Sequence, residues 1–428
     1  MSDKLNIQSP KGMHDILAEE YAFYQNICDK AEEIASYYGF KPIHLPIMEN
    51  IALFTAAIGE SSDIVEKEMY IIKSEGEDKL ALRPEATASV IRAYVEHGMH
   101  NLPQPVMLWY KGSFFRHENP QKGRFREFQQ FGLEIIGEPK PIGEAIIIQM
   151  INLTLKELGL ENLVVHINSI GDKECRGEYR KRLINYYRKN LGPACKDCKK
   201  RFKTNPLRLL DCKEEQCAQI KKDAPQTVDS LCAPCKQHLK EVLEFLETNE
   251  INYVLDTHLV RGLDYYSRTV FEFYSGNSDQ RPMAVAAGGR YDYLAKLLGK
   301  RDAPAVGGAI GVDRVAMIMR EKNILAKPKR IAKVFLIQLS PAAKQKSLLV
   351  IEMFRKANIY IAQSISKDNL NSQLGLASRL EVPYVLIIGQ KESLENSIIL
   401  RDMAAGSQES VPTEKIVEAV RKKIKGGK

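Results

Sequence analysis

The stretch Phe125-Arg-Glu-Phe-Gln-Gln-Phe-Gly-Leu-Glu134 decides the fold of the region around it. Successive side chains of a β-strand point to opposite faces, so Gln130, Gly132 and Glu134 share one face, opposite Phe131. The apolar face belongs in a core. On the polar face, a glycine between two hydrogen-bonding side chains leaves room for a ligand to approach the backbone, which suits a small cationic or hydrogen-bonding substrate. A solvent-exposed strand face explains the pattern equally well.

A second strand-like run, from Val106 to Arg116, precedes this stretch, and a polar loop containing Gly and Pro joins the two. We therefore predict a long antiparallel hairpin. Arg116 at the strand end and Arg124 and Arg126 nearby are suited to phosphate oxygens, because a guanidinium donates two hydrogen bonds in a fixed geometry. Surface ion pairs are the simpler explanation of the same arginines.

Elements of the same kind extend the hairpin in both directions. Helices are expected at Tyr21–Tyr38 and Glu144–Leu158, and the two prolines of Lys41–Pro46 indicate an extended segment that is not a central strand. Short strands are expected at Leu163–Ile167, Tyr253–Leu255, Thr269–Tyr274, Ala284–Gly289 and Gly307–Gly311. The predicted fold is therefore α+β, with one antiparallel unit over residues 1–171 and 248–326.

Residues 172–247 interrupt this unit, because they are rich in Lys, Arg and Cys and have a helical pattern. We predict an inserted helical domain. A charged linker, Lys327–Arg330, precedes a third pattern, in which strands alternate with helices from Val334 to the terminal helix that begins at Thr413. Residues 331–428 are thus predicted to form a small α/β domain.

Length and composition agree with this division. At 428 residues the chain has room for about three domains, and 44% hydrophobic and 27% charged residues are typical of globular proteins, not of disordered or fibrous ones. The net charge of +8 suits a polyanionic partner. No signal peptide is evident and no apolar run approaches the roughly 18 residues that span a bilayer, so we expect a cytoplasmic protein without a membrane partner.

Six of the eight cysteines cluster between Cys195 and Cys235 of the inserted segment, apart from Cys28 and Cys175. The C-x-x-C pairs Cys195/Cys198 and Cys232/Cys235 have a spacing suited to tetrahedral Zn²⁺. Cys212, Cys217 and His238 are substitute ligands. The alternative is a set of reduced, partly buried thiols.

Three glycine-containing segments carry the remaining candidate chemistry: Leu259–Tyr266, Ala287–Asp292 and Gly307–Arg314. The first two each place Arg, Asp and Tyr near glycine, and the third leads into a helix whose first turn holds Asp313 and Arg314. The chain has neither a P-loop nor a dinucleotide-binding fingerprint.

Five motifs resemble, in order and spacing, the histidyl-tRNA synthetases of the bacterial type, which are class II aminoacyl-tRNA synthetases. They are Leu82–Thr87, Phe115–Glu118, Leu259–Tyr266, Ala287–Asp292 and Gly311–Arg314. Ile58–Met69 lies near the first motif of the family. The resemblance implies a six-stranded antiparallel catalytic sheet, a homodimer joined partly around Pro46 and a C-terminal anticodon-binding α/β domain.

The resemblance also implies a reaction, the ligation of histidine to tRNA. ATP and L-histidine give histidyl-adenylate and pyrophosphate, and the histidyl group then passes to the 3′ end of histidine tRNA with release of AMP. Mg²⁺ is expected with ATP, because a cation neutralises the polyphosphate.

Site residues are implied one by one. Arg261, the catalytic residue, and Arg116 contact the α-phosphate; Arg124 and Arg314 hold the rest of ATP together with Glu118. Glu85, Thr87 and Gln130 hold the α-amino group of histidine, Glu134 and Tyr266 read its imidazole, and Tyr265 and Tyr291 line the pocket. Gln121 matches the position associated with the 5′ guanosine of the tRNA. Ala86 departs from the family, where glycine is frequent.

Two other interpretations are weighed against this one. A histidine-binding regulatory paralogue of a phosphoribosyltransferase typically loses the phosphate-binding arginines and the C-terminal domain, both of which this chain has. Another class II synthetase, such as the prolyl or threonyl enzyme, would not have Leu259–Tyr266 in this form.

Overall fold

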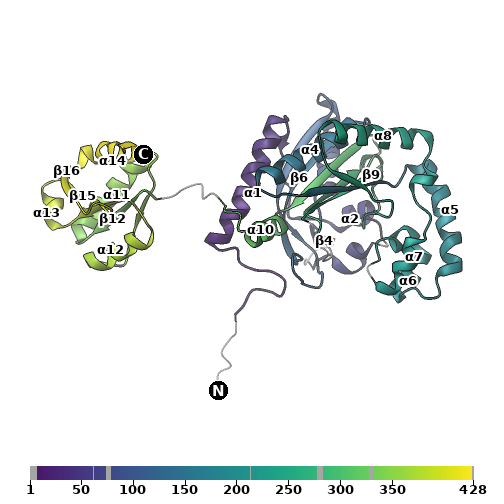
Figure 1. Ribbon diagram of the computed structural model, residues 1–428, viewed down its shortest axis with the longest axis horizontal. Helices are drawn as coiled ribbons and strands as arrows, with labels where there is room; N and C mark the ends of the chain where they lie inside the picture. The colour runs from purple at the N-terminus through teal and green to yellow at the C-terminus, as the bar shows by residue number, and fades with distance from the viewer. Residues whose placement is uncertain are drawn as a thin grey trace, which may run out of the picture. The chain divides into compact units, whose positions relative to one another are not determined.

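The computed structural model describes residues 7–60, 62–73, 79–212, 214–276, 283–326 and 332–426. The chain divides into two compact units, Met1–Lys327 and Pro328–Lys428 (Figure 1). Each unit buries apolar side chains of its own. The predicted linker Lys327–Arg330 lies outside the described residues.

The first unit is built on an eight-stranded sheet. Its strands, in sheet order, are β1 (Lys41–Pro42), β5 (Val106–Phe115), β6 (Glu127–Ile136), β11 (Ala305–Gly311), β10 (Ala286–Arg290), β9 (Ser267–Ser275), β7 (Leu163–Ser169) and β8 (Tyr253–Leu255). Neighbours from β5 to β7 are antiparallel, whereas β1 and β8 are short parallel edges. The expected antiparallel sheet is therefore confirmed. Pro42 lies in an edge strand, where its missing N–H breaks no ladder.

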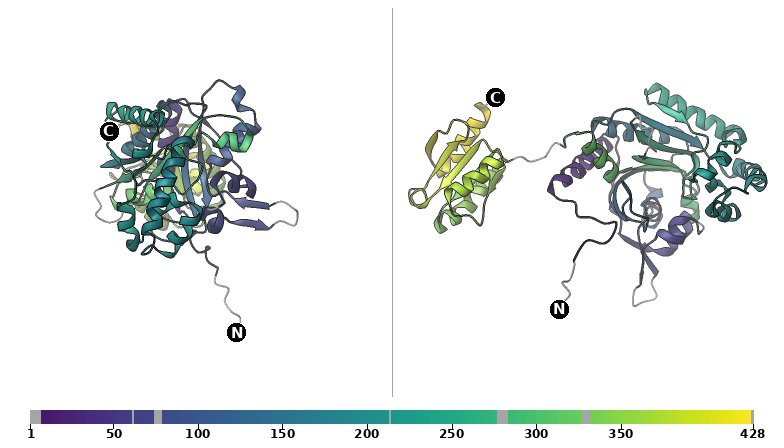
Figure 2. Two further views of the ribbon diagram at one scale, coloured as in Figure 1. Left: turned by 90° about the vertical axis from the view of Figure 1, so that its right-hand side faces the viewer. Right: turned by 60° about the horizontal axis from the view of Figure 1, so that its bottom comes forward.

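One face of this sheet packs against helices. Helix α1 (Ala18–Tyr37) lies beside α10 (Val312–Glu321), although they are far apart in sequence, and α4 (Ile142–Glu157) contacts both α1 and β11 (Figures 1 and 2). Phe131 is buried on this face, where its ring stacks on Trp109 with the centroids 5.3 Å apart. The period-two pattern of β6 therefore predicted its core side correctly.

Shorter elements gather near the opposite face. They are α2 (Ile51–Ile58), the π-helical turn Ile64–Glu68, α3 (Thr87–Glu96), the 3-10 turn Met99–Asn101, α9 (Leu294–Gly299) and a three-stranded sheet of β2 (Met48–Asn50), β4 (Lys79–Leu82) and β3 (Ile71–Lys73). Their apolar side chains join those of Tyr110, Tyr265 and Tyr291 in a second core. The polar residues of β6 thus face a buried region, and the exposed-strand explanation is wrong for Glu134.

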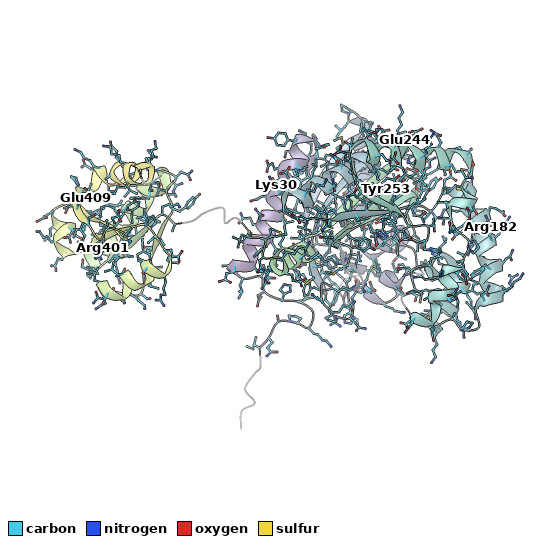
Figure 3. The ribbon with its side chains drawn as sticks, viewed as in Figure 1. Lys30, Arg182, Glu244, Tyr253, Arg401 and Glu409 are labelled. Atoms are coloured by element: carbon cyan, nitrogen blue, oxygen red, sulfur yellow. The ribbon has the colours of Figure 1, made fainter. Side chains whose placement is uncertain are left out.

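Within its described residues, the segment between β7 and β8 is helical, as expected. Its elements are α5 (Lys173–Asn190), α6 (Lys196–Thr204), α7 (Ala218–Lys222), α8 (Ala233–Thr248) and the 3-10 turns Pro206–Leu209, Glu215–Cys217 and Val228–Ser230. Arg182 on α5 and Glu244 on α8 are exposed on its outer side (Figure 3). The C-terminal half of α8 packs into the core of the main sheet through Val242 and Leu246.

The second unit is a small α/β structure with a mixed sheet. Its strand order is β13 (Ile361–Gln363), β12 (Val334–Gln338), β14 (Tyr384–Ile388), β15 (Ser397–Asp402) and β16 (Gln408–Pro412), and its helices are α11 (Pro341–Lys356), α12 (Leu370–Arg379), α13 (Gln390–Leu394) and α14 (Ile416–Gly426). The first three strands are parallel. The sequence pattern had not indicated β15 or β16. The polar residues of β16 do not alternate with apolar ones.

In the described part of the chain, none of the helices is both long and apolar enough to cross a membrane.

Candidate functional site

Glu134 lies at the centre of the buried polar region. It extends from β6 and is only 1% exposed. Its carboxylate accepts a hydrogen bond from the Tyr291 hydroxyl and another, 2.9 Å long, from the Thr87 hydroxyl. Burial raises the pKa of Glu134 to about 8, because these hydrogen bonds offset only part of the desolvation. Near neutral pH this carboxyl group can therefore exchange a proton with a ligand.

Glycine at position 307 makes room for this carboxyl group. Gly307 pairs with Glu134 across β11 and β6, and a Cβ atom there would lie 1.6 Å from Oε2 of Glu134. Gly132 has a different role from the one expected. Its cross-strand partner is Tyr110, and an added Cβ would lie 2.0 Å from the Tyr110 ring, so a tyrosine and not a ligand fills the space above this glycine.

Tyrosines and a second carboxylate line the rest of the pocket. The rings of Tyr265 and Tyr266 are 4.7 Å apart between centroids, and those of Tyr265 and Tyr291 are 5.7 Å apart. The hydroxyl of Tyr265 donates to Glu85 over 3.3 Å. Desolvation, together with neighbouring negative charge, raises the pKa of the phenols of Tyr265 and Tyr291, which keeps them protonated hydrogen-bond donors.

Glu85 connects the pocket to a helix end. Its carboxylate accepts from the backbone N–H groups of Thr87 at 2.7 Å and Ala88 at 2.9 Å, which are the first residues of α3. These N–H groups have no partner inside the helix, so Glu85 satisfies them as a cap would. Burial raises the pKa of Glu85 above its ordinary value despite these bonds. Ala86, the departure from the family pattern, is buried directly before α3.

Beside the pocket lies a cluster of three arginines. Nε of Arg116 donates to the carbonyl of Pro84 at 2.9 Å, and Arg314 donates to the carbonyls of Gly123 and Ala284. Burial, followed by the positive charges of Arg124 and Arg116, lowers the pKa of Arg314. Arginines that influence one another in this way are expected where an anion binds between them.

Arg261 lies between the pocket and this cluster. Its guanidinium forms an ion pair with Glu272 of β9 and stands 5.9 Å from the centre of the Tyr266 ring. Burial alone would lower the pKa of Arg261, but the charge of Glu272 outweighs it and the pKa is raised. The charge of Glu272 also acts to raise the pKa of Arg314, so one carboxylate influences both arginines.

Three further predicted residues lie around these groups. Glu118 forms an ion pair with Arg124 over 3.3 Å. Gln121 forms a β-bridge with Arg124 in the hairpin loop and is exposed. Gln130 is half-buried on β6, where it pairs with Gly112 of β5 and Gly311 of β11.

Some residues of the glycine-containing segments serve the structure instead. Arg290 is fully buried in an ion pair with Glu144, which lies on the helix-covered side of the sheet. Burial would raise the pKa of Glu144, but hydrogen bonds and the charge of Arg290 lower it to about 2. Asp313 accepts hydrogen bonds from Tyr24 and the backbone of Gln129, so it fastens α10 to α1 and β6.

The cysteines of the inserted segment form two separate groups. One contains Cys195, Cys198, Cys212 and Cys217; the other contains Asp172, Cys175, Cys232 and Cys235. The pairs Cys195/Cys198 and Cys232/Cys235 therefore fall in different groups, and the substitutes Cys212 and Cys217 join the first. His238 is not a substitute ligand, because its Nε2 lies 2.6 Å from the Glu144 carboxylate.

Sequence reasoning missed two members of the site. Tyr110 lies close enough to Glu134 to lower its pKa, and Glu272 holds Arg261. The register of the hairpin, which sets Tyr110 opposite Gly132, could have revealed the first. No local signal indicated Glu272, since its partner comes from a loop outside the sheet.

Known proteins are similar to this chain over almost its whole length. A family model described as histidyl-tRNA synthetase matches residues 12–315, and one described as anticodon binding domain matches residues 333–423. The histidine–tRNA ligase of Syntrophotalea carbinolica is 39% identical over 99% of this chain and 100% of that protein. The ligase of Thermodesulfovibrio yellowstonii is 41% identical over 96% of this chain and 98% of its own. The crystal structure of apo histidyl-tRNA synthetase from S. aureus matches with a TM-score of 0.80 at 30% identity, covering 97% of this chain and 99% of that one.

Proposed function

The chain belongs to the histidyl-tRNA synthetase family, and we propose that the Glu134 pocket and the arginine cluster are its sites for histidine and ATP. Its reaction is the ATP-dependent ligation of histidine to tRNA. A single observation carries the assignment of the sites. A buried pocket of carboxyl groups and phenols borders a cluster of arginines, and Arg261 lies where the two meet.

Histidine binds with its imidazole toward Glu134. An imidazole has a donor on one ring nitrogen and an acceptor on the other. The Glu134 carboxylate accepts from one nitrogen, and the hydroxyl of Tyr266 donates to the other. Tyr265 and Tyr291 line the ring, and Glu85, Thr87 and Gln130 hold the α-amino group. A site that pairs both nitrogens rejects amino acids lacking them by as much as ~10⁴-fold, so no editing domain is needed.

ATP binds across the arginine cluster. Arg124 and Arg314 hold its outer phosphates, while Arg116 and Arg261 contact the α-phosphate and Glu118 orients Arg124. A carboxylate oxygen of histidine attacks the α-phosphorus; the bond to the oxygen bridging to the β-phosphate breaks, and pyrophosphate leaves with that electron pair. Arg261 stabilises the negative charge that grows in this step. Mg²⁺ accompanies ATP in this family and neutralises the polyphosphate.

The remaining parts of the chain serve tRNA and assembly. We assign residues 1–171 and 248–326 to catalysis, 172–247 to a helical insertion and 331–428 to anticodon binding, and we place the reaction in the cytoplasm. Gln121, in the exposed hairpin loop, reads the 5′ end of histidine tRNA. In the basic stretch of α6, Lys200 and Arg201 already pair with Glu66 and Asp63, which leaves Lys196, Lys199 and Lys203 as exposed charges for phosphate.

A homodimer is supported by the apolar surface around Pro46. Ile47 and Met48 are each 49% exposed and Ile71 of β3 is 60% exposed, which is costly for a monomer. Light scattering on the full chain should give twice the mass of 48.4 kDa. A mass of one chain would contradict the dimer.

Histidine-dependent exchange of pyrophosphate into ATP tests the function and the role of Arg261 together. The wild-type chain should exchange with histidine and with no other amino acid. Arg261→Ala should lower kcat about 10² to 10³-fold, the usual loss when one donor to a developing charge is removed. Arg182→Ala, an exposed arginine of α5, is the control and should retain full activity.

Two outcomes would count against these assignments. Histidine binding without any exchange in the wild-type protein would favour the regulatory paralogue. Full activity of Arg261→Ala would leave the ligase reaction in place but remove Arg261 from it.

A further inference from the structure

We propose that the inserted segment binds two structural Zn²⁺ ions. The four-thiol site consists of Cys195, Cys198, Cys212 and Cys217, and the Asp172 site consists of Asp172, Cys175, Cys232 and Cys235. The two sites take the place of the single site that the C-x-x-C pairs suggested.

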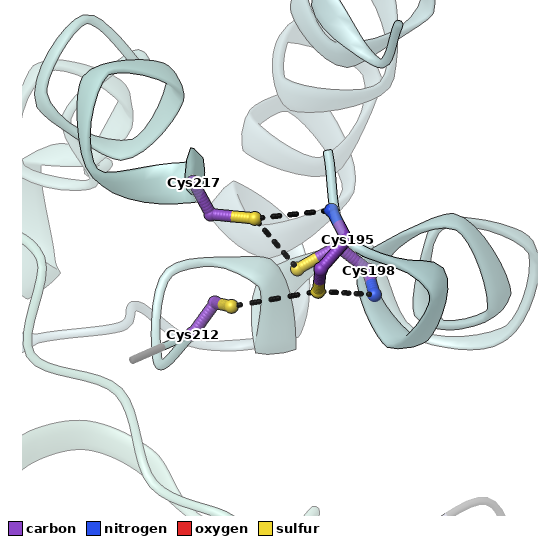
Figure 4. Close-up of side chains that lie close together, drawn as sticks. All are labelled: Cys195, Cys198, Cys212 and Cys217. Atoms are coloured by element: carbon purple, nitrogen blue, oxygen red, sulfur yellow. Dashed lines mark hydrogen bonds between the residues drawn. The ribbon is translucent and has the colours of Figure 1, made fainter. Parts of the chain in front are cut away.

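The four-thiol site has the dimensions of a zinc site. Zn–S bonds of about 2.3 Å in a tetrahedron put the sulfurs about 3.8 Å apart. The Sγ atoms of Cys195 and Cys212 are 3.8 Å apart, as are those of Cys198 and Cys217 (Figure 4). All four Sγ atoms lie within 4.8 Å of one another. A disulfide would need about 2.05 Å, so the spacing fits a shared ion and not a covalent pair.

Two of the four sulfurs accept hydrogen bonds from backbone N–H groups. The backbone N–H of Cys198 donates to Sγ of Cys195 at 3.3 Å, and the N–H of Cys195 donates to Sγ of Cys217 at 3.3 Å (Figure 4). Four thiolates around Zn²⁺ have a net charge of −2, which the basic residues of α6 offset. All four cysteines are buried. They pack in one core with Leu183, Tyr187 and Leu209, so the ion would cross-link the elements that form this core.

The Asp172 site also fits a tetrahedron. With Zn–S of about 2.3 Å and Zn–O of about 2.1 Å, sulfur and oxygen ligands stand about 3.6 Å apart. Sγ of Cys175 lies 3.3 Å from Oδ1 of Asp172, and Sγ of Cys232 lies 3.9 Å from the same oxygen. Cys235 completes the group and is 1% exposed. Three sulfurs and one carboxylate oxygen are a ligand set that suits zinc.

The Asp172 site joins the two ends of the insertion. Asp172 and Cys175 lie at the start of α5, and Cys232 and Cys235 lie at the start of α8, which returns to the main core. One turn into α5, Arg176 donates to the carbonyl of Tyr266 over 2.8 Å. A metal at this end therefore fixes the helix that supports the wall of the histidine pocket.

The four-thiol site holds α6 and the turn after it, which contact Asp63 and the segment Leu259–Tyr266. On α6 and just after it, Arg201 and Arg208 bond the carboxylate of Asp63, at 2.9 and 2.6 Å. Asn205 donates to Asp264 at 2.8 Å, in the segment that also contains Arg261. Both metals would fix the insertion against the segment Leu259–Tyr266, which contains Arg261.

Metal analysis of the full-length protein tests the proposal. Protein purified with zinc present should contain two zinc per chain by mass spectrometry of its metals. Cys217→Ser and Cys232→Ser should each retain one. Cys28→Ser, a cysteine of α1 outside both groups, is the matched control and should retain two.

A second measurement covers variants that do not fold. A mercurial added to the wild-type chain should release both zinc ions as it titrates the cysteine thiols, and Co²⁺ in their place should give the intense visible bands of tetrahedral thiolate sites. Zinc-free protein with eight free thiols, one zinc per chain, or iron instead of zinc would overturn the proposal.

Discussion

At the scale of single residues, burial sets the chemistry of the pocket. Glu134 is held between two hydroxyl donors in a site from which water is excluded, so the neutral carboxyl group is favoured up to a pKa of about 8. Histidine, with an imidazole that gains or loses a proton near neutrality, is a ligand that such a group can match. On an exposed strand the same carboxyl group would be ionised at every pH near neutrality. It would then distinguish little between histidine and other ligands.

The raised pKa of Glu134 makes the stability of the first unit depend on pH. The folded state binds a proton that the unfolded state releases, so this contribution is complete below the ordinary pKa of 4.5 and is lost as pH rises through about 8. The loss amounts to about 4 kcal/mol. Glu134→Gln removes this titration. Between pH 5 and pH 9 the free energy of unfolding of the variant should therefore rise by about 4 kcal/mol relative to that of the wild type.

Urea unfolding of both proteins at several pH values, followed by fluorescence, measures this difference. The chain has one tryptophan, Trp109 of β5, which reports on the first unit alone. A pH-independent difference between the two proteins would show that Glu134 ionises normally. Above pH 8, where Glu134 is ionised, histidine binding should weaken at least about 10-fold in Glu134→Gln, because a charged hydrogen-bond partner is lost.

At the scale of elements, the site depends on how closely neighbouring strands approach. The carboxylate of Glu134 lies over the backbone of β11 at Gly307, and the ring of Tyr110 lies over β6 at Gly132. Both contacts are cross-strand pairs, so the register of the sheet, and not any local motif, brings the groups together. A shift of one residue would turn Glu134 into the helix-covered core.

Gly307→Ala should therefore damage the pocket without changing its chemistry. The new methyl group would overlap Oε2 of Glu134 and approach the backbone carbonyl of Leu133 to 2.8 Å, so either the carboxylate or the strand must move. We expect a loss of about 1–3 kcal/mol in stability and at least a 10-fold rise (~1.4 kcal/mol) in the KM for histidine.

Gly177→Ala provides the matched comparison for this strand variant. Its added methyl group meets nothing within 4 Å on α5, and alanine favours a helix by about 0.5–1 kcal/mol over glycine. Calorimetry and steady-state kinetics of both variants decide the matter. An unchanged KM in Gly307→Ala would mean that Glu134 has no fixed place in the pocket.

At the scale of the whole molecule, the two units have separate cores. The apolar clusters of residues 332–426 contain no residue of the first unit. The pocket and the arginines that we propose for the activation of histidine all come from the first unit, whereas tRNA is long enough to require contacts elsewhere. The two half-reactions are thus expected to depend on different parts of the chain.

Removal of residues 328–428 should separate these activities. The shortened chain should keep pyrophosphate exchange within about twofold, while kcat/KM for charging histidine tRNA should fall about 100-fold or more, an amount equal to ~2.7 kcal/mol of lost tRNA contacts. Both reactions are measured on the same preparation, with circular dichroism as a control for folding. Equal losses in the two assays would contradict the separation.

The sequence by itself determined the order of most elements and the antiparallel and α/β classes of the two units, and it suggested the residues that we propose for the reaction. These follow from local periodicity and from short motifs, both of which are readable along the chain. It did not reveal β15, and it did not reveal β16 because a polar edge strand has no alternation to read. Nor did it reveal that Arg290 is structural, since Arg290, like Arg261, lies in a segment that also contains glycine, Asp and Tyr.

Only the tertiary structure decided the remaining questions. The cysteines separate into two groups because α5 and α8 begin side by side and α6 folds back on the turns that follow it, contacts that no spacing in sequence specifies. Tyr110 enters the pocket through strand register, and Glu134 acquires its raised pKa only when surrounding elements exclude water. Proximity and desolvation are properties of the folded chain. The grouping of the cysteines depends on the first, and the raised pKa of Glu134 depends on the second.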